Sequence, residues 1–114
     1  MQQKALEVLG DSNRKFASSQ FVKLEVNPKA IYHKQTDEAQ FYEEFFSAVI
    51  YWANNLEKVV QDAYDIGCEH GLAAMDALHI AAALSIGAEE FVTTEKSTKP
   101  MFRVTSIQVI SIFS

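Results

Sequence analysis

The sequence predicts an α/β protein in which helices cover both faces of a mainly parallel sheet. Short strand-like segments alternate with longer helical ones along the 114 residues, an order typical of parallel sheets. An alanine-rich helical segment, residues 72–86, ends at Gly87 and leads into a strand at 90–94. Hydrophobic residues make up 48% of the chain, enough for a core, and the length indicates one domain over residues 1–114.

Apolar periodicity and turn residues define the individual elements. The expected helices span residues 2–9, 20–26, 37–56, 62–69 and 72–86. The expected strands span residues 15–17, 57–60, 90–94 and 104–112. Gly10 and Gly71 end the first and fourth helices, and the Asn27–Pro28 pair breaks or kinks the second.

The second helix directs an acidic side chain toward the core. Ser18 or Ser19 is suited to cap its first turn, because a hydroxyl accepts a hydrogen bond from the free amides there. Phe21 and Val22 lie four and three residues before Glu25, so these side chains share one face of the helix. Glu25 is therefore expected to point inward.

The helix expected over residues 37–56 has a broad apolar face. Its apolar residues cover more than one side of the helix, and they are Phe41, Phe45, Phe46, Val49, Ile50 and Trp52. Such a face packs in the core of its own chain or extends into a contact with another subunit. Both interpretations stay open at the level of the sequence.

Asp76 stands within the most apolar stretch of the chain, residues 71–87. A helix that is apolar on every face is normally buried, and a buried carboxylate is costly unless its charge is compensated. A metal ion, a cationic partner or a bound proton would compensate it. Alternatively, Asp76 lies on a wetter edge of the helix or caps a neighbouring one. His79 follows one turn later and is expected to pack or to hydrogen-bond a nearby polar group.

Three acidic residues are positioned to converge. In open parallel sheets, sites form beyond the carboxyl ends of the strands. Glu95 follows the strand at 90–94, while Glu25 and Asp76 come from inward-facing helix positions. Three carboxylates in one place repel one another, and a hard divalent cation such as Mg²⁺ or Mn²⁺ relieves that repulsion. Such an ion can activate water for phosphodiester cleavage.

Charge and cysteine content narrow the environment of the protein. The net charge is −5, yet residues 14–34 are basic while residues 35–94 are strongly acidic. A basic segment of this kind either holds phosphates or forms ordinary charged surface. The single cysteine, Cys68, excludes an internal disulfide and is expected as a small core residue. With no signal peptide and no membrane-spanning apolar run, the sequence predicts a cytoplasmic protein without a membrane partner.

Two segments resemble the PIN-domain family. The segment from Asp76 to Glu95 has an acid opening an alanine-rich helix, a glycine turn, and a strand that ends in threonine and an acid, as in the C-terminal signature of the family. The segment from Ser19 to Glu25 resembles the second acidic motif of the family. The similarity covers most of the chain, residues 15–112.

The resemblance implies a three-layer α/β/α PIN-like fold and a ribonuclease site. The residues that match the catalytic, metal-binding acids are Glu25, Asp76 and Glu95. The residues that match supporting polar positions are Ser19, Thr93 and Thr94. The basic residues expected to contact RNA are Lys23, Lys96 and Lys99. The implied cofactor is Mg²⁺ or Mn²⁺, and the implied substrate is single-stranded RNA.

The first strand of the family, which is central in its sheet and ends in a metal-binding Asp, has no counterpart in this sequence. The resemblance therefore implies a mainly parallel sheet that lacks its central strand. The flanking strands either shift together, so that residues 15–17 pair with 90–94, or are completed by another copy of the chain. We expect a homodimer, with helix 37–56 or a sheet edge at the interface.

Two functions follow from these observations. The first is a metal-dependent endoribonuclease that hydrolyses phosphodiester bonds of single-stranded RNA, either free-standing or as a toxin whose partner is an antitoxin protein. The alternative is a catalytically inactive PIN-like domain that binds nucleic acid or protein. The three acids favour the first function, and the lack of the first Asp favours the second.

Overall fold

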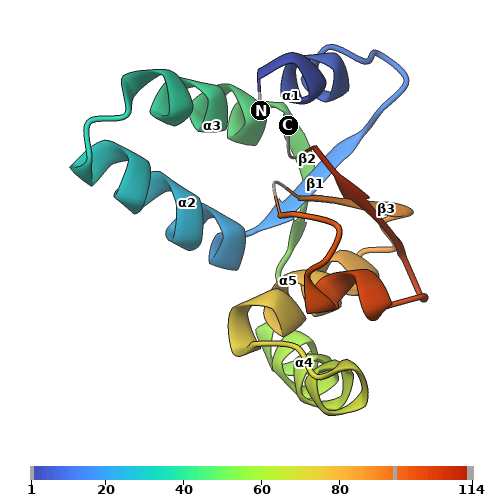
Figure 1. Ribbon diagram of the computed structural model, residues 1–114. Helices are drawn as coiled ribbons and strands as arrows, with labels where there is room; N and C mark the ends of the chain where they lie inside the picture. Colours follow the sequence, from blue (N-terminus) through green and yellow to red (C-terminus); the bar gives the residue numbers. More distant parts are fainter. Residues whose placement is uncertain (1, 94, 113–114) are drawn as a thin grey trace.

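The computed structural model describes residues 2–93 and 95–112, in which helices alternate with short strands (Figure 1). The helices are α1 (Gln2–Leu9), α2 (Gln20–Tyr32), α3 (Thr36–Ala48), α4 (Leu56–His70), α5 (Ala74–Ser85) and the 3-10 helix η1 (Pro100–Arg103). The strands are β1 (Phe16–Ser19), β2 (Val49–Ala53), β3 (Glu90–Thr93) and β4 (Gln108–Ser111). None of the described helices combines the length and the apolar content needed to cross a bilayer.

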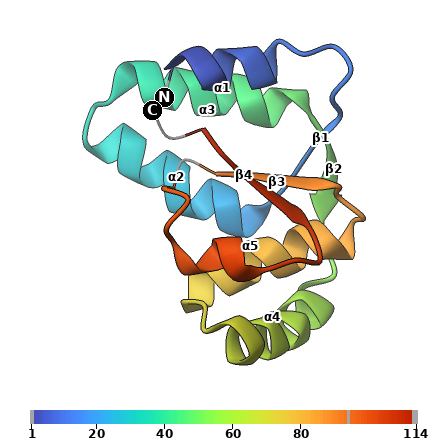
Figure 2. The same ribbon diagram turned by 45° about the vertical axis from the view of Figure 1, so that its right-hand side comes forward.

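The four strands form two parallel pairs. β1 pairs with β2, and β3 pairs with β4. Helices lie on both sides of the strands, with α1, α2 and α3 on one side and α4 and α5 on the other (Figures 1 and 2). The predicted α/β class and the parallel strand direction are therefore confirmed. Direct pairing of the flanking strands β1 and β3 does not occur within the described part of the chain, so a single continuous sheet is not formed.

The end of the helix expected over residues 37–56 is instead strand β2. α3 ends at Ala48, and Val49–Ala53 pairs with β1 along the length of that strand. The β-branched and aromatic residues of this segment suit an extended chain better than a helix. Hydrogen bonds to β1 therefore decide in favour of the strand.

Residues 57–60, expected as a strand, lie in the first turns of α4. Asn55 caps this helix, because its side-chain oxygen accepts a hydrogen bond from the amide of Lys58 at 3.2 Å. Val59 is fully buried against alanines of α5, so packing and capping together outweigh the preference of valine for strands. The helix ends at Gly71, as predicted, with a φ of 69° that favours glycine.

Helix α2 runs past the break expected at Asn27–Pro28 and ends at Tyr32. Proline removes one helical hydrogen bond, the one to the carbonyl of the residue four positions earlier, which is Leu24. Because Leu24 is 70% exposed, water can hydrogen-bond this carbonyl. The helix therefore continues through the proline.

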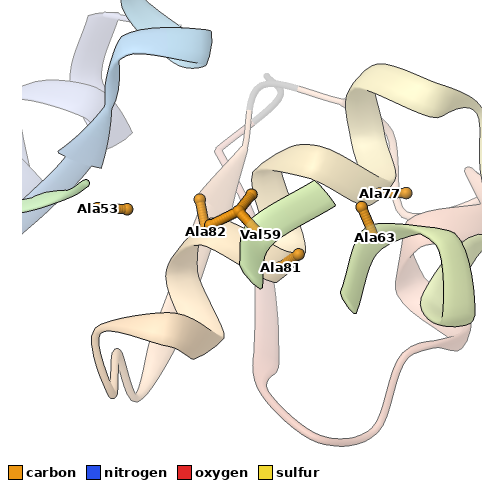
Figure 3. Packing of buried hydrophobic residues seen from close by; sticks show 6 residues of the cluster. All are labelled: Ala53, Val59, Ala63, Ala77, Ala81 and Ala82. Atoms are coloured by element: carbon orange, nitrogen blue, oxygen red, sulfur yellow. The ribbon is translucent and has the colours of Figure 1, made fainter. Parts of the chain in front are cut away.

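Small residues form the contact between α4 and α5. The main buried cluster consists of Ala53, Val59, Ala63, Ala77, Ala81 and Ala82 (Figure 3). Alanine side chains let the two helices approach closely, and Val59 fills the space between them. Cys68, expected as a small core residue, is instead exposed on α4.

The C-terminal segment packs against another part of α5. Ile80 is fully buried in a second cluster with Val104 and Ile107. The strand expected over residues 104–112 is therefore shortened to β4. Its first part forms a loop between η1 and β4 whose apolar side chains are buried.

A cleft of about 780 Å³ is lined by β1 and β3. The aromatic residues of α3 that line the same cleft are Phe41, Tyr42, Phe45 and Phe46. The aromatic face of α3 is therefore turned toward the cleft between the strand pairs of its own chain.

Candidate functional site

Asp76 lies in the first turn of α5 and is half-buried. The N-terminal end of a helix favours a negative charge. Burial nevertheless raises the pKa of the Asp76 carboxyl above its usual value, and the charges of Glu95 and Glu25 raise it further. His79 and Lys99 lower it. Asp76 therefore lies at the wetter end of its helix, but its charge is opposed by two neighbouring acids.

Glu25 is held by a histidine of α5. Its Oε1 lies 3.2 Å from Nε2 of His79, which donates to the carboxylate when Nε2 carries the proton. The His79 side chain is 6% exposed, whereas that of Glu25 is 47% exposed. The prediction that Glu25 points into the core is therefore wrong. The carboxylate lies at the rim of the cleft, where water reduces the cost of its charge.

Glu95 lies just beyond β3, as predicted, and is exposed. Hydroxyl groups from two strands hold its backbone. Thr93 Oγ1 accepts a hydrogen bond from the Glu95 amide at 3.1 Å, and Ser111 Oγ of β4 donates to the Glu95 carbonyl at 2.6 Å. Thr93 thus contacts the residue that it was expected to support. Thr94, the second threonine expected there, lies outside the described residues.

Ser19 caps the helix that carries Glu25. It is 1% exposed, and its hydroxyl accepts a hydrogen bond from the amide of Val22 at 3.3 Å. The predicted cap is therefore confirmed. Ser19 supports the site by anchoring the start of α2, which then presents Glu25 toward α5.

The three lysines expected to contact RNA differ in their surroundings. Lys99 is exposed and near enough to Asp76 for its charge to lower the pKa of that carboxyl. Lys96 is exposed in the same loop. Lys23 lies over the ring of Phe46, with its Nζ 5.9 Å from the ring centre. Two of the lysines thus lie in the loop that follows Glu95, while Lys23 contacts α3.

The charges of Glu25 and Glu95 act on Asp76, but the described acids do not stand together as a metal site. Their oxygen atoms suit Mg²⁺ or Mn²⁺, and the repulsion that raises the pKa of Asp76 is of the kind that such an ion relieves. Among residues 2–93 and 95–112, however, no three acidic, histidine or cysteine side chains stand close enough together to hold a metal ion. The donor chemistry fits the ion, but the three carboxylates would have to move closer together to coordinate it.

The sequence did not reveal the roles of two residues at this site. Spacing placed His79 beside Asp76, but its bond to Glu25 joins positions 54 residues apart. The Nδ1 atom of His79 is buried and has no hydrogen-bond partner in the described part of the chain, which is uncommon for a buried polar atom. Ser111 contacts Glu95 from another strand, and no local sequence pattern indicates that contact.

Comparisons of the chain with protein-family models, with curated proteins and with solved structures found no match.

Proposed function

We propose that this chain is a PIN-like, metal-dependent endoribonuclease domain that hydrolyses phosphodiester bonds of single-stranded RNA. The observation that carries the proposal is that Glu25 of α2 and Glu95 beyond β3 lie near enough to Asp76 of α5 for their charges to raise its pKa. Like charges repel, so acids from separate elements that lie near one another lower the stability of the fold. Such arrangements are typical of functional sites.

Several polar groups near these acids have a role in the proposed chemistry. Mg²⁺ or Mn²⁺, when bound, would supply a Lewis acid that activates water and stabilises phosphate oxygens. The three carboxylates would hold the ion. Thr93 orients the turn that presents Glu95. Lys96 and Lys99 would attract the phosphate backbone of RNA toward the acids.

The arrangement of the strands supports the PIN-like part of the proposal. The resemblance implies a parallel sheet without its central strand. β1 and β3 belong to two separate parallel pairs and line a common cleft, as this arrangement would require. Helices on both sides of the strands agree with a three-layer architecture (Figure 2).

A catalytically inactive domain that binds nucleic acid or protein is the second candidate. One observation favours it: within the described residues, the acids are not gathered for metal binding, and Glu25 is engaged by His79. In that case His79 would hold Glu25 permanently, and Lys96 and Lys99 in the loop after Glu95 would serve binding alone.

A cleavage assay separates the two candidates. A fluorescently labelled single-stranded oligoribonucleotide is incubated with Mn²⁺ and wild-type protein, Asp76→Asn or Asp65→Asn. Asp65 is an exposed acid on α4, so its substitution is the matched control. We expect wild type and Asp65→Asn to cleave equally and Asp76→Asn to be inactive. Saturable RNA binding without cleavage by any of the proteins would overturn the ribonuclease proposal in favour of the second candidate.

We further propose that the protein forms a homodimer in the cytoplasm. Since the aromatic residues of α3 line the cleft, a sheet edge is the better supported of the two homodimer interfaces. Ile50 and Tyr51 of β2 are 59% and 52% exposed and would contribute apolar surface to it. An antitoxin protein is a further proposed partner, and the proposed RNA substrate agrees with a cytoplasmic protein.

A further inference from the structure

The cleft between the strand pairs has two open strand edges as walls. All four residues of β1 and all four residues of β3 line it, whereas β2 contributes Tyr51 and no residue of β4 contributes. In a two-stranded parallel sheet, each strand leaves alternate N–H and C=O groups unpaired on its outer edge. The cleft therefore presents main-chain donors and acceptors from two opposite sides.

The helices that line this cleft contribute mainly apolar side chains. On the α5 side these are Ala82, Ala83 and Ile86. From α2 and α3 they include Val22, Val26, Phe41 and Phe45. An extended chain directs successive side chains to opposite faces. A strand placed in the cleft would thus bury one set of side chains against α5 and the other set against α2 and α3.

The charged rim of the cleft is mostly acidic. The acids that line it are Asp11, Glu25, Glu89 and Glu90, against the bases Arg14 and Lys15. Arg14 donates a 2.6 Å hydrogen bond to Glu90 and so links the approach to β1 with the start of β3. Arg14 also lies 3.5 Å from Asp11, and Glu25 contacts His79. The four acids still outnumber the two bases, so basic residues at the ends of a bound segment would complement the net charge of the rim.

We propose that this cleft binds an extended polypeptide segment of another protein, which inserts as a strand between β1 and β3. The segment has apolar side chains on both faces over about four residues, the length of each flanking strand, and basic residues at its ends. This inference goes beyond the proposed ribonuclease activity and does not depend on it.

A second copy of the chain is a poorer occupant. The described strands are already paired, and the irregular residues 10–15 and 95–99 are polar. Residues 104–107 include two apolar side chains, but both are buried in the core. RNA is a poorer occupant as well, because it offers no main-chain amide ladder and the helical walls are apolar.

Fluorescence anisotropy with a designed peptide tests the proposal. The probe is a fluorescein-labelled peptide with a Val-Ile-Val-Ile core between pairs of lysines. The matched control carries N-methyl groups on alternate core amides, which remove hydrogen-bond donors and keep the apolar side chains. We expect the parent peptide to bind wild-type protein saturably and the N-methylated peptide to bind about tenfold more weakly, since each hydrogen bond contributes roughly a factor of 2 to 10.

Photo-crosslinking then locates the bound peptide. With photo-leucine in the core, we expect crosslinks to residues of β1 and β3. Ala83→Phe, which narrows the cleft from α5, is expected to weaken binding, while Tyr64→Ala on the exposed face of α4 is expected to leave it unchanged. If Ala83→Phe does not fold, the comparison of the two peptides and the crosslinks, both measured on wild-type protein, still test the proposal.

Three results would overturn the proposal. Equal affinity of the two peptides would indicate apolar adsorption rather than strand pairing. Crosslinks confined to the exposed apolar residues of α4, Leu56, Val60 and Tyr64, would place the peptide elsewhere. Absence of saturable binding to wild-type protein would exclude the site.

Discussion

Replacement of Ser19 by alanine tests how the candidate site is anchored. Ser19 is almost fully buried and caps α2, with its hydroxyl accepting a hydrogen bond from the Val22 amide at 3.3 Å. Helix α2 carries Glu25, whose carboxylate contacts His79. The Ser19→Ala variant therefore removes one hydrogen bond and leaves a half-buried amide without its partner.

The expected loss of unfolding free energy follows from these contacts. Removal of a serine cap costs about 1 kcal/mol in typical cases and about 2 kcal/mol at most. A buried donor left unsatisfied costs about 1–3 kcal/mol, and the half-buried Val22 lies toward the lower end of that range. The serine hydroxyl itself no longer has to be buried, which offsets part of the loss. We expect a net loss of about 1–2 kcal/mol, or roughly 4–8 °C in melting temperature.

Asn55→Ala is the matched control, because Asn55 caps α4 through a similar 3.2 Å bond to the Lys58 amide. Both of these residues are exposed, so water replaces the lost acceptor and the expected loss is about 0.5 kcal/mol. Urea unfolding followed by circular dichroism measures both variants. A loss in Asn55→Ala as large as that in Ser19→Ala would refute the argument that burial makes the Ser19 cap the more important one.

The remaining predictions concern charge, metal binding, packing and assembly. Burial and the charges of Glu95 and Glu25 raise the pKa of Asp76 in the folded state, so protonated Asp76 stabilises the fold at low pH, and this stabilisation is lost as the pH rises through the folded-state pKa. Asp76→Asn should therefore increase the unfolding free energy at pH 7, and the increase should become smaller as the pH is lowered toward 3.8, the usual pKa of the group. No increase at pH 7 would contradict the pKa shift. Isothermal titration should show weak Mn²⁺ binding to the wild-type protein. Glu25→Gln should weaken this binding, whereas Glu44→Gln, on the exposed side of α3, should leave it unchanged. Equal effects of the two variants would show that Glu25 is not part of the metal site. Ile80→Ala should cost about 2–4 kcal/mol in urea unfolding because Ile80 is fully buried, while Leu24→Ala, at a 70% exposed position, should cost little. Light scattering coupled to size exclusion should give the mass of a dimer, and a mass near 12.8 kDa would contradict the homodimer.

Local sequence signals predicted the features that depend on neighbouring residues. The glycine at position 71 ends α4 in the left-handed conformation that only a residue without a side chain adopts at low cost. Ser19 caps α2 because its hydroxyl reaches an amide three residues later. The order of α5, a glycine turn and β3 likewise follows from signals in consecutive residues. The same signals place Glu95 just beyond the strand.

Contacts between distant segments decided the rest. Val49–Ala53 becomes a strand because β1 supplies its hydrogen-bond partners, and residues 57–60 become helical because α5 supplies the surface that buries Val59. The bond between His79 and Glu25 joins residues 54 positions apart, and Glu25 lies at the rim of the cleft instead of in the core. The sequence by itself thus determined the end of α4 at Gly71, the Ser19 cap and the position of Glu95 beyond β3, because these depend on interactions within one or two turns. Only the tertiary structure decided which segments pair and where the acids lie relative to one another, because strand partners and burial depend on the surfaces of other elements.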